Sequence, residues 1–172
     1  NRINKSAKTE GLAGSEAVAH KKHNNQYKKW ANGGVGISVT GNVQIDHRYI
    51  ERAGNVVIEG EQSNESLAAL ADWSHAGTQN NTHLWMQLSH AGRQTPFSIN
   101  KESAAPSVQP LPTLGGILKF GVPKELTHSE ILDIVDRFVN AAEIAKQTGF
   151  TGVQLHSAHG YLLSCLLYTS PS

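Results

Sequence analysis

Two hydrophobic periodicities that alternate along the chain most constrain its fold. Residues 131–145 place apolar side chains on one helical stripe, and residues 151–156 then alternate with a period of two, as a strand does. The segment Thr127-His128-Ser129-Glu130 matches a capping box at the start of this helix, and Gly149 lies just beyond its end. The pattern therefore predicts a helix that leads directly into a strand.

The same alternation recurs earlier in the chain. Strands are expected at roughly residues 1–9, 35–40 and 83–89, and a hairpin at residues 55–60. Helices are expected from Ser15, a candidate N-cap, to Asn32, and again around Leu67, Leu70 and Ala71. Strands that alternate with helices predict an α/β fold with a parallel sheet, either doubly wound or closed into an eight-stranded TIM barrel. In a barrel, about four βα units would form one half.

The third expected strand has two distinct faces. Gln87 and Ser89 lie opposite Leu84, Met86 and Leu88, so Gln87 should face the barrel interior if the apolar side chains face outward. The connection that follows, residues 90–126, holds most of the prolines and is long for a structureless loop. It is therefore a candidate functional loop.

Charge and composition exclude several classes of protein. The 172 residues carry a net charge of +1, with no basic stretch interleaved with aromatics, so neither a nucleic-acid nor a membrane partner is expected. No apolar stretch approaches the roughly 20 residues of a spanning helix, and residues 1–5 do not resemble a signal peptide. A single cysteine, Cys165, rules out an internal disulfide framework. We expect a cytoplasmic protein.

Residues 154–161 gather the side chains with the clearest chemistry. His156, His159 and Tyr161 follow the last expected strand within six residues. Neutral histidines can donate hydrogen bonds to one oxygen and a phenol can give up a proton, so the cluster could polarise and protonate an unsaturated carbonyl compound. A metal site built on the histidines is an alternative, although no carboxylate lies near them in the sequence. The glycines at 33–36 precede a strand, which favours helix termination over a dinucleotide fingerprint.

Four segments, in order, resemble the old yellow enzyme family of flavin-dependent ene-reductases, particularly its NADH:flavin oxidoreductase and 2,4-dienoyl-CoA reductase-like members. The segments are Asn1-Arg2-Ile3 to Ser6-Ala7-Lys8-Thr9-Glu10, Gly36-Ile37-Ser38-Val39-Thr40-Gly41-Asn42-Val43, Gln87-Leu88-Ser89-His90-Ala91-Gly92-Arg93-Gln94, and residues 149–164. Four matches in family order are more specific than any one of them. The resemblance implies that residues 1–164 are the amino-terminal half of an FMN-binding TIM barrel.

The resemblance also implies roles for individual residues. The first strand would run beneath the flavin, Gly41 would contact it through backbone, and the Gln87 amide would bond its pyrimidine edge. His156 and His159 would grip the substrate oxygen, and Tyr161 would donate the proton. NADH or NADPH would reduce FMN, and the flavin would pass hydride to an activated alkene. The first-strand residues assigned to the flavin are Ser6, Ala7, Lys8 and Thr9.

The resemblance ends after Ser164, and residues 165–172 are interpreted as a non-native tail. The flavin phosphate site of the family comes from later strands, so the chain is expected to be a fragment that is inactive alone. Its expected partner is a small-molecule substrate, with a homo-oligomer as a further option. Two alternatives stay open: a non-catalytic half-barrel that acts as an assembly module, and a metal-dependent barrel hydrolase.

Overall fold

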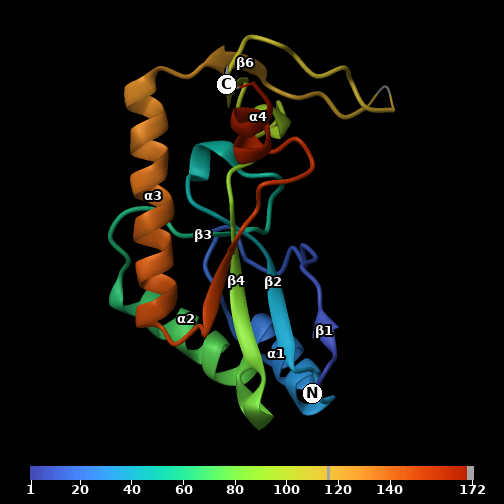
Figure 1. Cartoon of the computed structure of the whole chain (residues 1–172), viewed down its shortest axis with the longest axis vertical. Helices are drawn as coiled ribbons and strands as arrows, with labels where there is room; N and C mark the ends of the chain where they lie inside the picture. Colours follow the sequence, from blue (N-terminus) through green and yellow to red (C-terminus); the bar gives the residue numbers. More distant parts are fainter. Residues whose placement is uncertain (116, 170–172) are drawn as a thin grey trace.

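The computed structural model describes residues 1–115 and 117–169, which form a five-stranded parallel sheet with helices packed on it (Figure 1). The strand order is β1-β2-β4-β7, and β3 pairs with the far end of β2. The strands of this sheet are β1 (Asn4–Lys5), β2 (Ile37–Gln44), β3 (Val56–Val57), β4 (His83–Ser89) and β7 (Gly152–Leu155). A separate parallel pair consists of β5 (Glu102–Ala105) and β6 (Val122–Glu125).

The longer helices are α1 (Lys21–Asn32), α2 (Asn64–Gly77), α3 (His128–Gln147) and α4 (Leu162–Thr169). Single turns of 3-10 helix are η1 (His47–Tyr49), η2 (Gln79–Asn81) and η3 (Gly92–Gln94). Among the described helices, none is long and apolar enough to cross a membrane.

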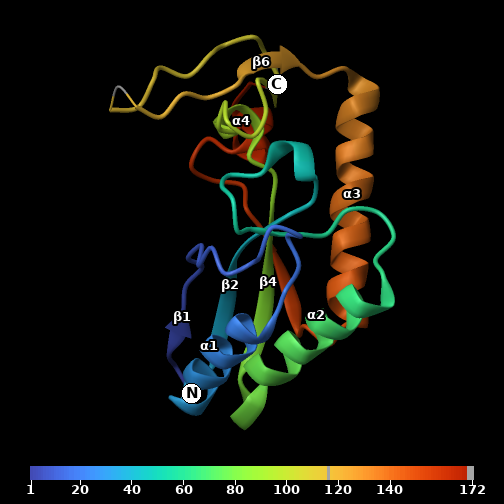
Figure 2. The ribbon, with the colours of Figure 1, turned by 180° about the vertical axis from the view of Figure 1, so that it is seen from behind.

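In the part of the chain that the structure describes, helices cover only one face of the sheet. Figure 2 shows α1 and α2 in front of the strands, whereas Figure 1 looks onto the face without them. The fully buried Leu84, Met86 and Leu88 of β4 join Trp73 of α2 and Phe138 of α3 in one core cluster. A doubly wound sheet has helices on both faces, whereas a barrel has them only outside. The arrangement is therefore that of part of a barrel, with Gln87 on the inner face as predicted.

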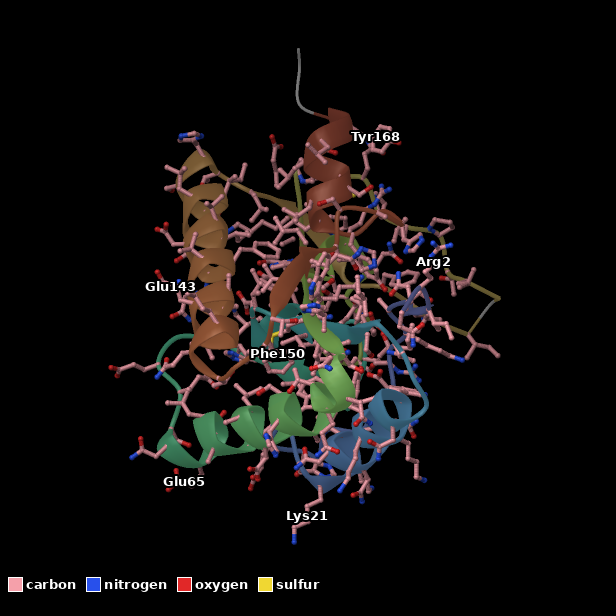
Figure 3. All side chains as sticks on the ribbon, turned by 60° about the horizontal axis from the view of Figure 1, so that its bottom comes forward. Arg2, Lys21, Glu65, Glu143, Phe150 and Tyr168 are labelled. Carbon is pink, nitrogen blue, oxygen red and sulfur yellow. The ribbon has the colours of Figure 1, made fainter. Side chains whose placement is uncertain are left out.

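The helix predicted from residue 127 is confirmed with its cap. Thr127 Oγ1 accepts a hydrogen bond from Glu130 N at 3.3 Å, and Glu130 Oε2 accepts one from Thr127 N at 2.8 Å. At the other end Gly149 has a φ of +92°, and Phe150 N donates to Ala145 O at 3.0 Å. This turn brings Phe150, labelled in Figure 3, into the core against Trp73 and starts β7.

The predicted start of the first helix at Ser15 is wrong. The helix α1 begins at Lys21 and is capped by His20, whose ring nitrogen accepts from Lys22 N at 3.4 Å. Ala17 has a φ of +56°, which does not fit a helix, and its carbonyl instead accepts a hydrogen bond from Val57 N at 2.8 Å. Histidine is not among the preferred N-cap residues, so the sequence pattern gave no sign of this cap.

Three strand predictions also need correction. The ladder of the first strand is limited to Asn4–Lys5 rather than residues 1–9. The second strand does not end at Thr40, because a bulge between Val39 and Asn42 lets β2 continue to Gln44. The expected hairpin at 55–60 is instead the short strand β3, which lies parallel to β2. Residues 90–126, expected as one long loop, contain η3, β5 and β6.

The expected tail from residue 165 is partly helical. Residues 165–169 form the last part of α4, and residues 170–172 lie outside the described residues.

Candidate functional site

Three side chains that the sequence grouped together are brought into ring contact just after β7. The ring centroids of His156 and Tyr161 lie 4.7 Å apart, and those of His156 and His159 lie 5.2 Å apart. A tight turn makes this possible, since His159 and Gly160 have φ values of 59° and 74°. Gln94 of η3 holds the turn through a hydrogen bond from its Nε2 to His159 O at 2.5 Å.

The backbone and the ring of His156 are both fixed. Its N–H continues the β7 ladder by donating to Leu88 O at 2.9 Å, and its Nδ1 accepts from Ala158 N at 3.4 Å. Burial lowers the pKa of His156, and the neighbouring His159 lowers it further. The ring is therefore neutral near pH 7, with its proton on Nε2, where it can donate to an oxygen. His159 is exposed at the surface of the turn.

Tyr161 has a partner that the sequence did not predict. Its hydroxyl donates to Glu51 Oε2 at 3.1 Å, and the same oxygen accepts a hydrogen bond from the Asn42 amide. Burial raises the pKa of Tyr161, and the charge of Glu51 raises it further. The phenol is therefore protonated at neutral pH, as a proton donor must be. Glu51 lies in an irregular segment after β2, where no periodicity marks it.

A row of amide side chains crosses the inner face of the sheet. Asn42, Gln87 and Gln154 are register neighbours on β2, β4 and β7, and Gln87 Nε2 donates to Gln154 Oε1 at 2.7 Å. The β2 bulge aligns this row. At the bulge the Thr40 hydroxyl takes the place of a backbone carbonyl and accepts a hydrogen bond from Gln87 N at 2.9 Å. Gln87 therefore lies on the same face as His156, which follows Gln154 by two residues.

The segment after β1 meets β2 at Gly41. A Cβ on Gly41 would lie 2.6 Å from Lys8 O and 2.8 Å from Thr9 Cα, so the two backbones are in close contact there. Ala7 and Thr9 are half-buried, whereas Ser6 and Lys8 are exposed. Thr9 and Gly41 are thus brought together, and Asn42 links them to Glu51 and Tyr161.

Two residues near the start of the chain hold this segment in place. Lys5 Nζ donates to Val39 O at 2.7 Å and lies 3.2 Å from Glu10 Oε1, which also accepts from the Tyr27 hydroxyl at 2.5 Å. Burial lowers the pKa of Lys5, and the Glu10 carboxylate partly opposes this shift. The sequence analysis missed Glu10, whose only signal was its position directly after Thr9.

The inner face carries groups suited to the polar edge of a flavin ring. Within the described residues, Asn42 Oδ1, both amide atoms of Gln44 and Ser89 Oγ are buried without a hydrogen-bond partner. Gln87 offers both a donor and an acceptor beside them. The cavity between Thr9 and Gly41 measures only about 10 Å³, so these two residues do not enclose a ring-sized space. The polar atoms on this face fit the edge of a flavin ring, and Gln87, Thr9 and Gly41 are candidates to hold it.

A different cluster contains the possible metal ligands. Among the described residues, Asp46, His47 and Glu59 form a group whose ligand atoms lie within 4.8 Å of one another. Arg48 already binds the buried Asp46, with Nη2 at 2.6 Å from Oδ2. Burial acts to raise the pKa of Asp46, but hydrogen bonds from Arg48 outweigh it and lower the pKa. This cluster is a network of ion pairs, and it does not include His156 or His159.

Comparisons with known proteins point to one family. The sequence model of the NADH:flavin oxidoreductase / NADH oxidase family matches residues 1–170. An NADH-dependent flavin oxidoreductase of Hypocrea jecorina is 34% identical over 95% of this chain and 44% of its own length. An NADH oxidase of Thermoanaerobacter brockii is 34% identical over 95% of this chain and 24% of its own length.

The fold agrees with these sequence matches. The old yellow enzyme homologue of Zymomonas mobilis superposes with a TM-score of 0.81 at 27% identity, over 94% of this chain and 46% of its own. The chain thus spans less than half the length of these relatives, and its strands and helices are part of their TIM barrel. Nothing in the comparisons supports the metal-dependent hydrolase or the non-catalytic module considered from the sequence. The chain belongs to the NADH:flavin oxidoreductase / NADH oxidase family, with the fold of the old yellow enzymes.

Proposed function

We propose that the protein from which this chain comes reduces activated C=C bonds with FMN and NADH or NADPH, and that residues 1–164 supply its substrate-activating side chains. The observation that carries this proposal is the ring contact of His156, His159 and Tyr161 on the sheet face that also bears Gln87. A neutral imidazole and a protonated phenol lie together there, which are the donors that an unsaturated carbonyl compound needs.

The names of relatives support the reaction class. A cinnamate reductase of Clostridium sporogenes is 29% identical over 89% of this chain, and its name describes reduction of an unsaturated carboxylate. NADH appears in the names of several relatives, and an NADPH dehydrogenase of a Geobacillus strain is 32% identical over 61% of this chain. We therefore leave the nicotinamide cofactor as NADH or NADPH.

Each residue has a distinct role in this proposal. Bound FMN would supply the hydride. His156 and His159 donate to the carbonyl oxygen of the substrate, and Tyr161 supplies a proton to the α-carbon. Gln87 bonds the pyrimidine edge of the flavin, Gly41 allows close backbone approach, and Thr9 places a hydroxyl near the ring. The neighbouring residues on the same segment, also assigned to the flavin, are Ser6, Ala7 and Lys8.

Three further points belong to the same proposal. The proposed substrate is a small molecule such as an enoyl compound, and the proposed location of the intact protein is the cytoplasm. A homo-oligomer stays a further option for the intact protein. Residues 165–172 remain proposed as a non-native tail.

The proposal can be tested in a chimera in which residues 1–164 replace the matching segment of the Thermoanaerobacter brockii NADH oxidase. Loaded with FMN, the chimera should oxidise NADH faster when 2-cyclohexenone is added. Tyr161→Phe should slow alkene reduction by about 10² to 10⁴ without loss of flavin, because a positioned general acid contributes about this much.

The flavin content of each variant, read from its visible spectrum, is the control. A chimera that holds FMN but gains no alkene-dependent NADH oxidation would contradict the proposed reaction. Equal alkene reduction by the Tyr161→Phe variant would contradict the role of the phenol.

A further inference from the structure

Arg93, in η3, is a cation without a partner. Within the described residues its guanidinium makes no hydrogen bond or ion pair, and its Nε is buried and unpartnered. The half-buried Arg137 differs, since its Nε lies 2.7 Å from Asp133 Oδ2, and even the exposed Arg48 is paired, with its Nη2 2.6 Å from Asp46 Oδ2. A half-buried charge that is neither paired nor fully hydrated is costly, so an anion at this position would be stabilised.

The Arg93 side chain lines a cavity of about 270 Å³. The cavity lies between η3, the end of β5 and the first turns of α4, where α4 and β5 pack together. None of its described lining residues is acidic, and Ser107 and Ser164 bring hydroxyl groups to its wall. Six of its described lining residues belong to residues 1–164, namely Arg93, Ala105, Pro106, Ser107, Gly160 and Ser164, and the proposal uses only these; Cys165 and Tyr168, which also line it, belong to the proposed tail.

The cavity adjoins the turn that carries the site. A Cβ on Gly92 would lie 3.0 Å from Leu162, and the Arg93 Nη2 lies 3.9 Å from the position of a Cβ on Gly160. Gln94 donates to His159 O at 2.5 Å. Three consecutive residues of η3 therefore pack on the turn between His159 and Leu162, and the guanidinium is held one residue away from both His159 and Tyr161.

We propose that Arg93 forms an anion subsite that binds a carboxylate or phosphate group carried by the substrate. This rests on the proposed function and deepens it, because among activated alkenes it favours those with an oxyanion beyond the reacting carbonyl over neutral ones. The planar guanidinium presents parallel N–H donors that match two oxygens of such a group. In a phosphate group, the serine hydroxyls of the cavity wall can donate to a third oxygen.

The test measures anion binding to this chain by NMR titration, without FMN, so its outcome does not depend on the proposed reaction. The probes are crotonate for a carboxylate and inorganic phosphate for a phosphate. We expect at least one probe to shift resonances of Arg93, Gly160 and Ser164, and to bind about tenfold more weakly to Arg93→Gln. Whichever anion binds more tightly identifies the source of the oxyanion.

Two further variants make the test specific. Arg93→Lys keeps the charge and should bind more tightly than Arg93→Gln, which separates loss of charge from loss of structure. Arg2→Gln makes the same chemical change at an exposed arginine beside β1, apart from α4 and Tyr168 in Figure 3, and should bind as the wild type does. Thermal unfolding followed by circular dichroism checks that every variant is folded. The proposal is overturned if neither anion binds the wild type, or if folded Arg93→Gln binds both anions as the wild type does.

Discussion

The hydroxyl of Tyr161 is kept protonated by its surroundings. Burial raises its pKa above the ordinary value of 10.0, and the carboxylate of Glu51, which accepts its hydrogen bond, raises it further. Ionisation of the phenol would place two negative charges side by side in a half-buried site. The raised pKa means that this residue stabilises the fold below about pH 10 and that the contribution is lost as the pH rises through the folded pKa.

We therefore predict that Glu51→Gln lowers the pKa of Tyr161. The measurement is an ultraviolet titration of the phenolate, with the curve of Tyr161→Phe subtracted so that only this tyrosine is followed. Glu61→Gln removes the same charge from an exposed position and should leave the curve of Tyr161 in place. An unchanged titration in Glu51→Gln would show that Glu51 does not contact the phenol in solution.

His90 makes a second contribution to the pH dependence of stability, in the acid range. It is 1% exposed, its Nε2 has no partner among the described residues, and burial lowers its pKa from 6.5 to about 4. The unfolded chain binds a proton at a higher pH than the folded chain does, so stability is full above pH 6.5 and falls towards pH 4. Between these pH values His90 lowers the free energy of unfolding by up to about 3 kcal/mol.

In His90→Asn the free energy of unfolding should depend less steeply on pH, because the titrating ring is gone. The asparagine Oδ1 can still accept a hydrogen bond from Gly92 N, as His90 Nδ1 does, so this contact is kept. Urea unfolding at several pH values between 7 and 4 gives the free energy of unfolding of each variant as a function of pH. The slopes of these curves are compared, so a difference in stability at pH 7 does not matter. His75→Asn, at an exposed position of α2, should keep the wild-type slope. If His90→Asn also keeps it, His90 is not buried as a neutral ring.

At the scale of single elements, the cap of α3 links a short sequence motif to a measurable energy. Thr127 and Glu130 bond each other's backbone N–H groups, which would otherwise lack partners at the helix start. Thr127→Ala should lower the free energy of unfolding by about 1 kcal/mol. Glu143→Ala, at an exposed mid-helix position labelled in Figure 3, is the control and should change it by less than about 0.5 kcal/mol. A similar loss in both variants would mean that the cap is not formed.

The sequence predicted those elements whose signals are local. The capping box and apolar stripe marked α3, and the alternation of Leu84, Met86 and Leu88 marked β4 and the inward face of Gln87. The same signals failed at β2, because a bulge at Thr40–Gly41 depends on a hydroxyl that bonds a neighbouring strand. They also failed at α1, whose cap is a histidine ring.

The candidate site shows the same division. The grouping of His156, His159 and Tyr161 was visible because they lie within six residues, and the structure brings their rings together. Glu51 and Arg93 reach the same turn from distant segments, and no pattern within either segment indicates the contact. Partners that meet only through tertiary packing cannot be read from one sequence.

At the scale of the whole molecule, we predict that this chain alone retains little FMN. It carries residues suited to the flavin ring, yet it spans 44% or less of its curated relatives, and the family resemblance places the phosphate site in later strands. After incubation with FMN and gel filtration, its visible absorbance should indicate far less than one flavin per chain. The Thermoanaerobacter brockii NADH oxidase, treated in parallel, is the positive control. A yellow, stoichiometric complex of this chain would show that the inner face alone suffices.

The outer strand of the sheet leads to the last prediction. Within the described residues β7 pairs only with β4, so its other edge offers unpaired N–H and C=O groups, and Leu155 on it is 53% exposed. Open apolar edges of this kind promote strand pairing between chains. Leu155→Lys should therefore reduce light scattering by concentrated protein, since a charged edge opposes pairing. Gln147→Lys adds the same charge at an exposed position of α3 and should scatter as the wild type does. If both variants suppress scattering equally, net charge rather than the β7 edge governs association.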